Sequence, residues 1–235
     1  MINYNGKSVI VTGASGGMGK IICERLARQG ANLAICSNDK DGILQLEQSL
    51  KSSCGVKAFA KAIDITKEAE VKEFFEAAAQ ANGKFSAMAN LAGLSIPAAI
   101  KDMELSDYET VMDVNVKGTF LTGKYFAQNA DKPAIIVNIG SVAAKNANAN
   151  APVYCTAKAA VNMLSQGMLL QMGSQDIRVT TINPGGTDTT FWGNRAVDKS
   201  RLMQAEDVAE IIMFALTSSP SVQIHDIYFE SSSRF

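Results

Sequence analysis

Short apolar segments alternate with amphipathic segments along almost the whole chain. Seven apolar runs, several of them rich in Val and Ile, have the length of buried strands. We expect these strands at residues 8–12, 32–36, 56–62, 85–89, 134–139, 179–182 and 223–229. The segments between them show helical spacing, and this alternation predicts an α/β fold with a doubly wound parallel sheet of about seven strands and helices on both faces.

Polar residues indicate where two of the helices begin. Thr66 is expected to cap a helix over residues 68–81, in which Val71, Phe74, Phe75 and Ala78 share one face. The segment Ser106-Asp107-Tyr108-Glu109 has the pattern of a capping box and is expected to open a long helix that carries Asn115.

Composition narrows the class of protein. The chain has 235 residues, of which 47% are hydrophobic and 19% are charged, and this is enough for one sizeable hydrophobic core. Its net charge is −1, and no block of basic residues indicates binding to nucleic acid. The four cysteines have no metal or disulfide spacing, and no apolar run reaches membrane-spanning length. The N-terminus lacks a secretory segment, so we expect a cytoplasmic protein. We expect residues 1–235 to form one domain, with no metal site and a short substrate lid near 187–203.

A glycine-rich turn follows the first predicted strand. Gly13-Ala14-Ser15-Gly16-Gly17-Met18-Gly19 separates residues 8–12 from a helical run over 20–29. Glycines allow a tight turn and a close approach of the backbone to a pyrophosphate, and the helix N-terminus offers free N–H groups. Strand, turn and helix in this order predict a dinucleotide site in a Rossmann-type sheet.

Tyr154 and Lys158 lie four residues apart on a predicted helix, so a phenol and an ammonium share one face. A positive charge beside a phenol favours the phenolate, so we expect Lys158 to lower the pKa of Tyr154 below about 10. A tyrosine adjusted in this way can transfer a proton near neutral pH.

Five motifs in order resemble those of short-chain dehydrogenases/reductases of the ketoreductase-like Tyr-x-x-x-Lys type. They are Thr12-Gly13-x-x-x-Gly17-x-Gly19, Asn90-Leu91-Ala92-Gly93, Asn115, the Ser141-to-Tyr154 spacing with Lys158, and Pro184-Gly185-Gly186-Thr187-Asp188-Thr189. The resemblance covers most of the chain, although Leu91 stands where the family usually has a second Asn. It implies an NAD(P)-dependent oxidoreductase that interconverts a carbonyl and a secondary alcohol, with a small molecule as substrate.

The resemblance also implies a role for each catalytic residue. Tyr154 is the general acid/base, and Ser141 holds the carbonyl oxygen. Lys158 lowers the phenol pKa and binds the nicotinamide ribose, while Asn115 holds a water that joins Lys158 to solvent. Cofactor contacts are implied for Gly13, Ser15, Gly17, Met18, Gly19, Ser37, Asn38, Asp64, Ile65, Asn90, Ala92, Gly93, Tyr154, Lys158, Pro184, Gly185, Thr187 and Thr189.

The end of the second strand bears on the choice of cofactor. An acidic residue there holds the 2′-hydroxyl of NAD and repels the phosphate of NADP. Ser37 and Asn38 occupy this position, with Lys40 nearby and Asp39 as the alternative ribose ligand. We therefore expect a weak preference for NADP, with NAD close behind.

The C-terminal third departs from the common family pattern. The predicted lid is short, and the Asp-Gly-Gly tail that is frequent in the family is missing. The residues of this part of the chain do not identify the substrate. Phe191 and Trp192 are equally well read as substrate contacts or as lid anchors, and Arg195 either meets a carboxylate or is a solvated lid residue.

Two other functions and an assembly state also follow from the sequence. A noncatalytic NAD(P)-binding sensor or scaffold is the main alternative, and a serine hydrolase that uses Ser15 of Gly13-Ala14-Ser15-Gly16-Gly17, with His225 as its base, is a remote one. The helices carrying Asn115 and Tyr154 are rich in small and apolar residues, so we expect a homodimer or homotetramer.

Overall fold

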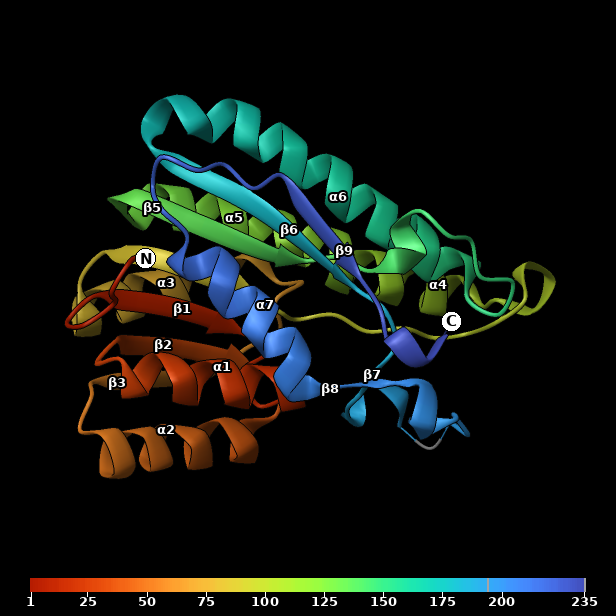
Figure 1. Cartoon of the computed structure of the whole chain (residues 1–235), viewed down its shortest axis with the longest axis horizontal. Coiled ribbons are helices and arrows are strands. Elements are labelled where there is room, and N and C mark those ends of the chain that lie inside the picture. The colour runs from red at the N-terminus through yellow and green to blue at the C-terminus, as the bar shows by residue number, and fades with distance from the viewer. Residues whose placement is uncertain (194, 235) are drawn as a thin grey trace.

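The computed structural model describes residues 1–193 and 195–234. Its main sheet has seven strands in the order β3-β2-β1-β4-β5-β6-β9, and every pairing is parallel (Figure 1). The strands are β1 (Ser8–Thr12), β2 (Asn32–Ser37), β3 (Ala58–Ala62), β4 (Phe85–Asn90), β5 (Ala130–Ile139), β6 (Ile177–Pro184) and β9 (Asp226–Phe229). The predicted doubly wound, Rossmann-type α/β fold is confirmed.

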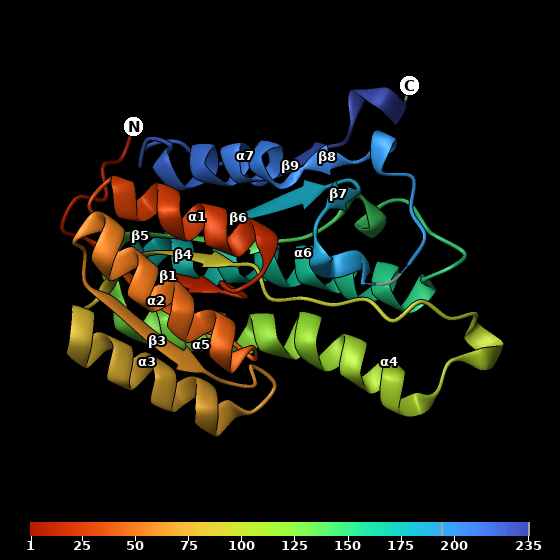
Figure 2. The same ribbon diagram turned by 90° about the horizontal axis from the view of Figure 1, so that it is seen from below.

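Helices cover both faces of the sheet, as Figure 2 shows from below. One face carries α1 (Gly17–Arg28), α2 (Lys40–Cys54) and α7 (Ala205–Thr217), and the other carries α3 (Glu68–Asn82), α5 (Gly118–Asn129) and α6 (Pro152–Met172). The strands have apolar residues on both faces because each face is covered: in β1, Val9 and Val11 pack with the first group and Ile10 with the second.

The ends of several helices differ from the sequence prediction. The helix α4 (Leu105–Met112) begins one residue before Ser106, so that residue lies in its first turn and the predicted capping box is wrong. Lys67 is the N-cap residue of α3, and the Thr66 hydroxyl donates to Asp64 instead. The sequence prediction missed the capping box of α7, whose Asp207 accepts a hydrogen bond from the Gln204 N–H.

The segment after β6 is a small lid built from short elements. Two-residue strands β7 (Thr187–Asp188) and β8 (Met203–Gln204) pair in parallel, with 3₁₀ turns at Thr190–Trp192 and Lys199–Arg201 between them. The predicted lid near 187–203 includes Asn194, which lies outside the described residues. No helix in the described part of the chain is long and apolar enough to cross a membrane.

The chain order places a topological switch point, where open parallel sheets have their ligand crevice, between β1 and β4. From β1 the chain runs outward through β2 and β3, and then returns to β4 on the other side of β1. Ligands of open parallel sheets bind at such a switch point, outside the carboxyl ends of the strands. The glycine loop, the segment after Asn90 and the residues after Ile139 and Asn183 all lie at these ends.

Candidate active site

The glycine loop between β1 and α1 is shaped by two glycines that the fold requires. Gly13 has a φ of +63°, and a Cβ there would lie 2.9 Å from the backbone N of Ala92. A Cβ on Gly19 would lie 2.4 Å from the Gly13 carbonyl oxygen. Gly17 differs, because its nearest neighbours would be side-chain atoms of Thr189 at 3.5 and 3.6 Å. The protein itself therefore leaves room at Gly17.

The first turn of α1 suits a phosphate group. The helix begins at Gly17, its N-cap Gly16 makes no side-chain hydrogen bond, and its first turn has no acidic residue. Free N–H groups and the positive end of the helix dipole favour an anion at this end. These first-turn N–H groups, with no side chain at Gly17, suit the pyrophosphate of a dinucleotide.

The glycine loop is attached directly to the end of β2. The Ser15 and Ser37 hydroxyl oxygens are 2.6 Å apart, and the Ser37 hydroxyl accepts the Asp39 N–H at 3.0 Å. The Asp39 carboxylate accepts the Gly42 N–H and caps α2. The Ser37 position thus has a hydroxyl and no carboxylate, and the Asp39 carboxylate already has a structural role as the cap of α2. Asn38 and Lys40 are exposed.

Ser15 does not form a hydrolase dyad with His225. The residue stands at the carboxyl end of β1, and His225 immediately precedes β9. Strands β4, β5 and β6 separate β1 from β9, which corresponds to roughly 19 Å at the usual strand spacing. The hydroxyl of Ser15 instead bonds with that of Ser37.

A row of buried polar side chains crosses the sheet beneath the crevice. The Thr12 hydroxyl donates to Asn90 Oδ1 at 2.7 Å and accepts the N–H groups of residues 91 and 92. Asn90 Nδ2 donates to Asn138 Oδ1 at 3.1 Å, and Asn138 Nδ2 donates to the Ser165 hydroxyl on α6 at 2.9 Å. This row joins the glycine-loop strand to α6 and fixes the segment that contains Ala92 and Gly93. Sequence reasoning missed Asn138 and Ser165, although an Asn within an apolar strand is a recognisable signal.

Lys158 is buried on α6 beside the crevice. Its side chain is 3% exposed, and Nζ donates to the Ile139 carbonyl oxygen at 2.9 Å. Burial lowers the Lys158 pKa to about 8, because removing an ammonium from water disfavours the charged form. Nζ lies 5.7 Å from the centroid of the Tyr154 ring.

Asn115 lies in a π-helical turn, Asp113–Lys117, between α4 and α5. Its Nδ2 donates to the carbonyl oxygens of Leu94 and Val111, both at 2.8 Å. Its Oδ1 is buried and has no hydrogen-bond partner among the residues that the structure describes. A Cβ on Gly93 would lie 2.8 Å from this Oδ1 and 3.2 Å from Lys158 Nζ, so both polar atoms border one small space. π-turns often mark functional sites, and this one presents an unpaired acceptor near an ammonium.

The Tyr154 pKa corrects one expectation from the sequence. Burial raises it to about 12, and hydrogen bonding with Ser141 and the charge of Arg195 lower it only in part. The expected pKa below about 10 is wrong for this structure, because loss of water around the phenol outweighs the neighbouring charges. Tyr154 is therefore a protonated phenol at neutral pH.

Ser141 follows β5 and is held through both its backbone and its hydroxyl. Its N–H donates to Asn183 Oδ1 at 3.0 Å. Its hydroxyl accepts the Ala143 N–H at 3.1 Å and makes a long contact of 3.5 Å with the Pro184 carbonyl oxygen. The hydroxyl of Ser141 also lies close enough to the Tyr154 phenol to lower its pKa.

The lid packs against Tyr154. The Phe191 and Tyr154 ring centroids are 5.7 Å apart, and the Trp192 indole N–H donates to the Thr187 carbonyl oxygen at 2.7 Å. The Arg195 guanidinium donates to the carbonyl oxygens of Phe191 and Trp192 and stacks on both rings. Arg195 is therefore engaged within the lid, Trp192 is an anchor, and Phe191 covers one side of the phenol.

The segment after β6 connects the lid to the sheet and to the glycine loop. The Gly185 N–H donates to the Phe229 carbonyl oxygen at 2.8 Å, and the Thr187 hydroxyl donates to the Gly185 carbonyl oxygen at 3.1 Å. The Thr189 hydroxyl accepts the Phe191 N–H, and the Thr189 side chain faces Gly17. The segment thus faces the glycine loop across the crevice.

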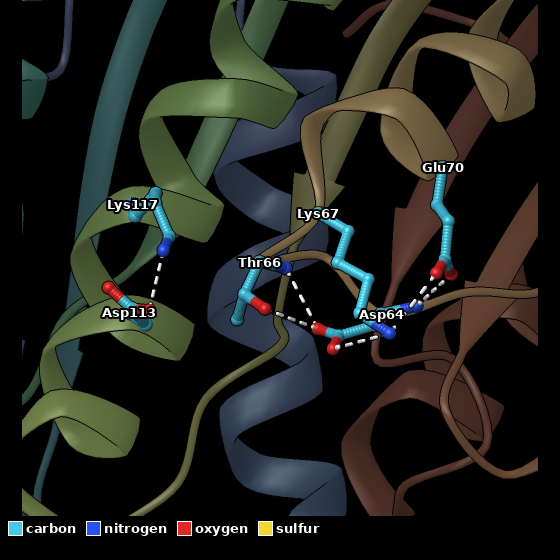
Figure 3. Close-up of polar contacts among 6 residues, drawn as sticks. All are labelled: Asp64, Thr66, Lys67, Glu70, Asp113 and Lys117. Carbon is cyan, nitrogen blue, oxygen red and sulfur yellow. Dashed lines mark hydrogen bonds and ion pairs between the residues drawn. The ribbon is translucent and has the colours of Figure 1, made fainter. Parts of the chain in front are cut away.

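Asp64 and Ile65 have local structural contacts. Figure 3 shows Thr66 and Lys67 converging on the Asp64 carboxylate: Oδ1 accepts the Thr66 N–H and hydroxyl, and Oδ2 lies 3.7 Å from Lys67 Nζ. These contacts lower the Asp64 pKa against the opposing effect of desolvation. Ile65 is buried, with its Cδ1 2.6 Å from where a Cβ of Gly118 would be. A contact of either residue with adenine stays a prediction.

Comparison with known proteins adds an independent finding. The sequence model of a family described as short chain dehydrogenase matches residues 7–200. An uncharacterized oxidoreductase of Staphylococcus saprophyticus is 28% identical over 97% of this chain and 98% of its own length, and another of Staphylococcus aureus is 28% identical over 94% and 95%. A solved short chain dehydrogenase from Burkholderia cenocepacia in complex with NADP is 25% identical, with a TM-score of 0.91 over 100% of both chains. An alcohol dehydrogenase from the archaeon Thermococcus sibiricus complexed with 5-hydroxy-NADP shares the fold, with a TM-score of 0.89, 23% identity and coverage of 96% and 97%.

Proposed function

Because this chain belongs to the short chain dehydrogenase family, we propose that it is an NAD(P)-dependent oxidoreductase that interconverts a carbonyl compound and a secondary alcohol. The arrangement of α6 carries the proposal: a protonated Tyr154 stands beside Ser141, with the buried ammonium of Lys158 one turn away. Tyr154, Ser141, Lys158 and Asn115 are the residues to which we assign the chemistry.

In the reducing direction, Tyr154 acts as a general acid. Its raised pKa keeps the proton on the phenol at neutral pH, so the proton is available when negative charge develops on the carbonyl oxygen. The Ser141 hydroxyl donates a hydrogen bond to the same oxygen and holds it near the phenol. The bound nicotinamide supplies or accepts the hydride, and the protein supplies position and electrostatics.

Lys158 and Asn115 return the proton to Tyr154. A phenolate formed by proton donation is stabilised by the Lys158 ammonium, which is charged below a pH of about 8. The unpaired Oδ1 of Asn115 can accept a hydrogen bond from a water that also contacts Lys158. Both atoms border the space over Gly93, where such a water would lie.

The cofactor would be held along the carboxyl ends of the strands. The first turn of α1 at Gly17 would hold the pyrophosphate, Asn90 would support the strand end near the adenosine ribose, and Thr189 would bind the nicotinamide from the lid. We propose a weak preference for NADP over NAD. Ser37 offers no carboxylate to repel a 2′-phosphate, and Asp39 already caps α2. The similar protein from Burkholderia cenocepacia was solved in complex with NADP.

The proposal also includes the domain organisation, the cellular location and the oligomeric state. We propose that residues 1–235 act as one cytoplasmic dinucleotide-binding and catalytic domain on a small carbonyl or alcohol substrate. We also propose a homodimer or homotetramer that pairs α5 and α6. The exposed apolar side chains Phe120, Met163 and Leu170 on these helices support such a contact.

Tyr154→Phe tests the proposed function. The ring and its packing against Phe191 remain, but no proton can be donated, so turnover of a panel of ketones with NADPH should fall at least about 1,000-fold. The dissociation constant for NADPH, measured by fluorescence titration, should change less than threefold. Ser15→Ala is the control for the hydrolase alternative and should retain most of the reductase activity.

The noncatalytic sensor makes a different prediction. It binds NADPH but turns over no carbonyl or alcohol, and Tyr154→Phe then changes nothing measurable. Wild-type-like turnover in Tyr154→Phe would remove Tyr154 from the mechanism.

A further inference from the structure

A second group of polar side chains, buried or half-buried, lies beneath α6, next to Ser141. Asn183 on β6 is fully buried, and its Oδ1 accepts the Ser141 N–H at 3.0 Å. Asn162, one turn beyond Lys158 on α6, donates from Nδ2 to the Tyr228 hydroxyl at 2.6 Å. Asn183 and Tyr228 are register partners on adjacent parallel strands, so their side chains lie on the same face of the sheet. That face is the one covered by α6.

Gly140 shows how closely the two amides approach the backbone before Ser141. A Cβ on Gly140 would lie 2.0 Å from Asn183 Oδ1 and 2.8 Å from Asn162 Oδ1. Both amides therefore occupy the space that a side chain at this position would need. They constrain the residue directly before Ser141.

The two amides also have complementary unpaired atoms. Among the described residues, Nδ2 of Asn183 and Oδ1 of Asn162 are buried and have no hydrogen-bond partner. One is a donor and the other an acceptor, so a single bridging water would give each of them a partner. Such a bridge would connect the Ser141 N–H through both amides to the hydroxyl of Tyr228.

We propose that Asn183, supported by Asn162 and Tyr228, is a positioning residue that fixes the backbone of Ser141 and so sets where its hydroxyl meets Tyr154. The Ser141 N–H donates to Asn183 Oδ1 at 3.0 Å, and this bond constrains the backbone from which the Ser141 hydroxyl extends toward Tyr154. The inference rests on the proposed function, because it assumes that Ser141 and Tyr154 act on one carbonyl oxygen.

Two variants separate this role from general stability. Asn183→Ala removes the acceptor for the Ser141 N–H, and Tyr228→Phe removes one hydroxyl at the far end of the group. Tyr4→Phe is the matched control, because it deletes a buried tyrosine hydroxyl that donates to the Leu216 carbonyl oxygen at 2.7 Å, away from Ser141.

Hydrogen exchange of the Ser141 amide, measured by NMR, gives a readout that needs no activity. Exchange should be at least 10-fold faster in Asn183→Ala and unchanged in Tyr4→Phe. An unchanged Ser141 amide in a folded Asn183→Ala protein would overturn the inference, whatever the enzyme does.

Kinetics give the second readout. We expect kcat for ketone reduction to fall 10- to 100-fold in Asn183→Ala and 3- to 10-fold in Tyr228→Phe, with NADPH affinity within twofold of wild type. Hydrogen bonding with Ser141 lowers the Tyr154 pKa, so the pH profile for alcohol oxidation should move to higher pH in both variants. In a Ser141→Ala background neither substitution should reduce kcat further, because the group it positions is already gone.

Equal losses of kcat with and without the Ser141 hydroxyl would overturn the positioning role, as would an unchanged kcat in a folded Asn183→Ala protein. If wild type turns over no carbonyl, the proposed function fails by itself. The exchange measurement would then still decide whether Asn183 fixes the Ser141 backbone. If Asn183→Ala does not fold, Tyr228→Phe carries the same comparisons against Tyr4→Phe.

Discussion

Lys158→Met should make the cofactor-free protein more stable at neutral pH while abolishing its activity. Lys158 has a pKa of about 8 in the folded protein against an ordinary value of 10.5, because burial disfavours its charge. Each pKa unit corresponds to about 1.4 kcal/mol, so burying this charge costs about 3 kcal/mol at pH 7. Met has a similar length and carries no charge.

One hydrogen bond of Lys158 opposes this gain in stability. Nζ donates to the Ile139 carbonyl oxygen, and an unpaired buried carbonyl costs about 1–3 kcal/mol. We therefore expect a net increase of about 1 kcal/mol in the free energy of unfolding of Lys158→Met at pH 7. That corresponds to roughly 2–4 °C in Tm for a chain of this size.

The pH dependence gives the sharper test, because the carbonyl contribution does not titrate. Lys158 has a folded pKa below its unfolded value, so its destabilising effect is complete below about pH 8 and disappears as pH rises through 10.5. Relative to wild type, the stability of Lys158→Met should fall by about 2–3 kcal/mol between pH 7 and pH 10. The Tyr154 phenol is present in both proteins, so to first order its titration cancels in the difference.

Urea titrations followed by circular dichroism at pH 7, 8.5 and 10 measure this difference directly. Lys84→Met is the control, because Lys84 is exposed at the start of β4 and its replacement should change stability by less than about 0.5 kcal/mol at every pH. A difference between Lys158→Met and wild type that does not vary with pH would refute the reasoning that a buried ammonium is held here against its desolvation cost. The same variant should lose ketone reduction with NADPH.

Three further predictions concern the cofactor and the phenol. Ser37→Asp should reverse the order of NADPH and NADH affinity, by about 10-fold or more, because a carboxylate repels the 2′-phosphate; titrations with each cofactor check this. Gly19→Ala should lower the free energy of unfolding by about 2 kcal/mol, measured by calorimetry, because its Cβ would overlap the Gly13 carbonyl oxygen. Gly17→Ala should instead fold normally and weaken NADPH binding, as measured by cofactor titration. The oxidation rate should still be rising at pH 8, because burial raises the Tyr154 pKa; a plateau well below pH 8, where the Lys158 ammonium is still charged, would show a phenol that ionises far more easily.

The sequence alone determined the order of elements and the motif positions. Alternating apolar and amphipathic segments were sufficient for the parallel sheet, since strands covered on both faces must be apolar throughout. The glycine loop was equally readable, because the φ at Gly13 and the close packing at Gly19 exclude side chains locally. For Tyr154 and Lys158, helical spacing already placed both on one face.

Only the tertiary structure decided the electrostatics and the supporting contacts. The sequence indicated that Lys158 lowers the Tyr154 pKa, but the degree of burial of both groups depends on α6 packing against β5 and on the lid covering the phenol. Asn162 and Asn183 are ordinary residues in the sequence and meet around Gly140 only because β5, β6 and α6 are adjacent. A desolvation cost or a hydrogen bond between distant segments depends on the surroundings in three dimensions, whereas strand length, helical spacing and glycine requirements are properties of neighbouring residues.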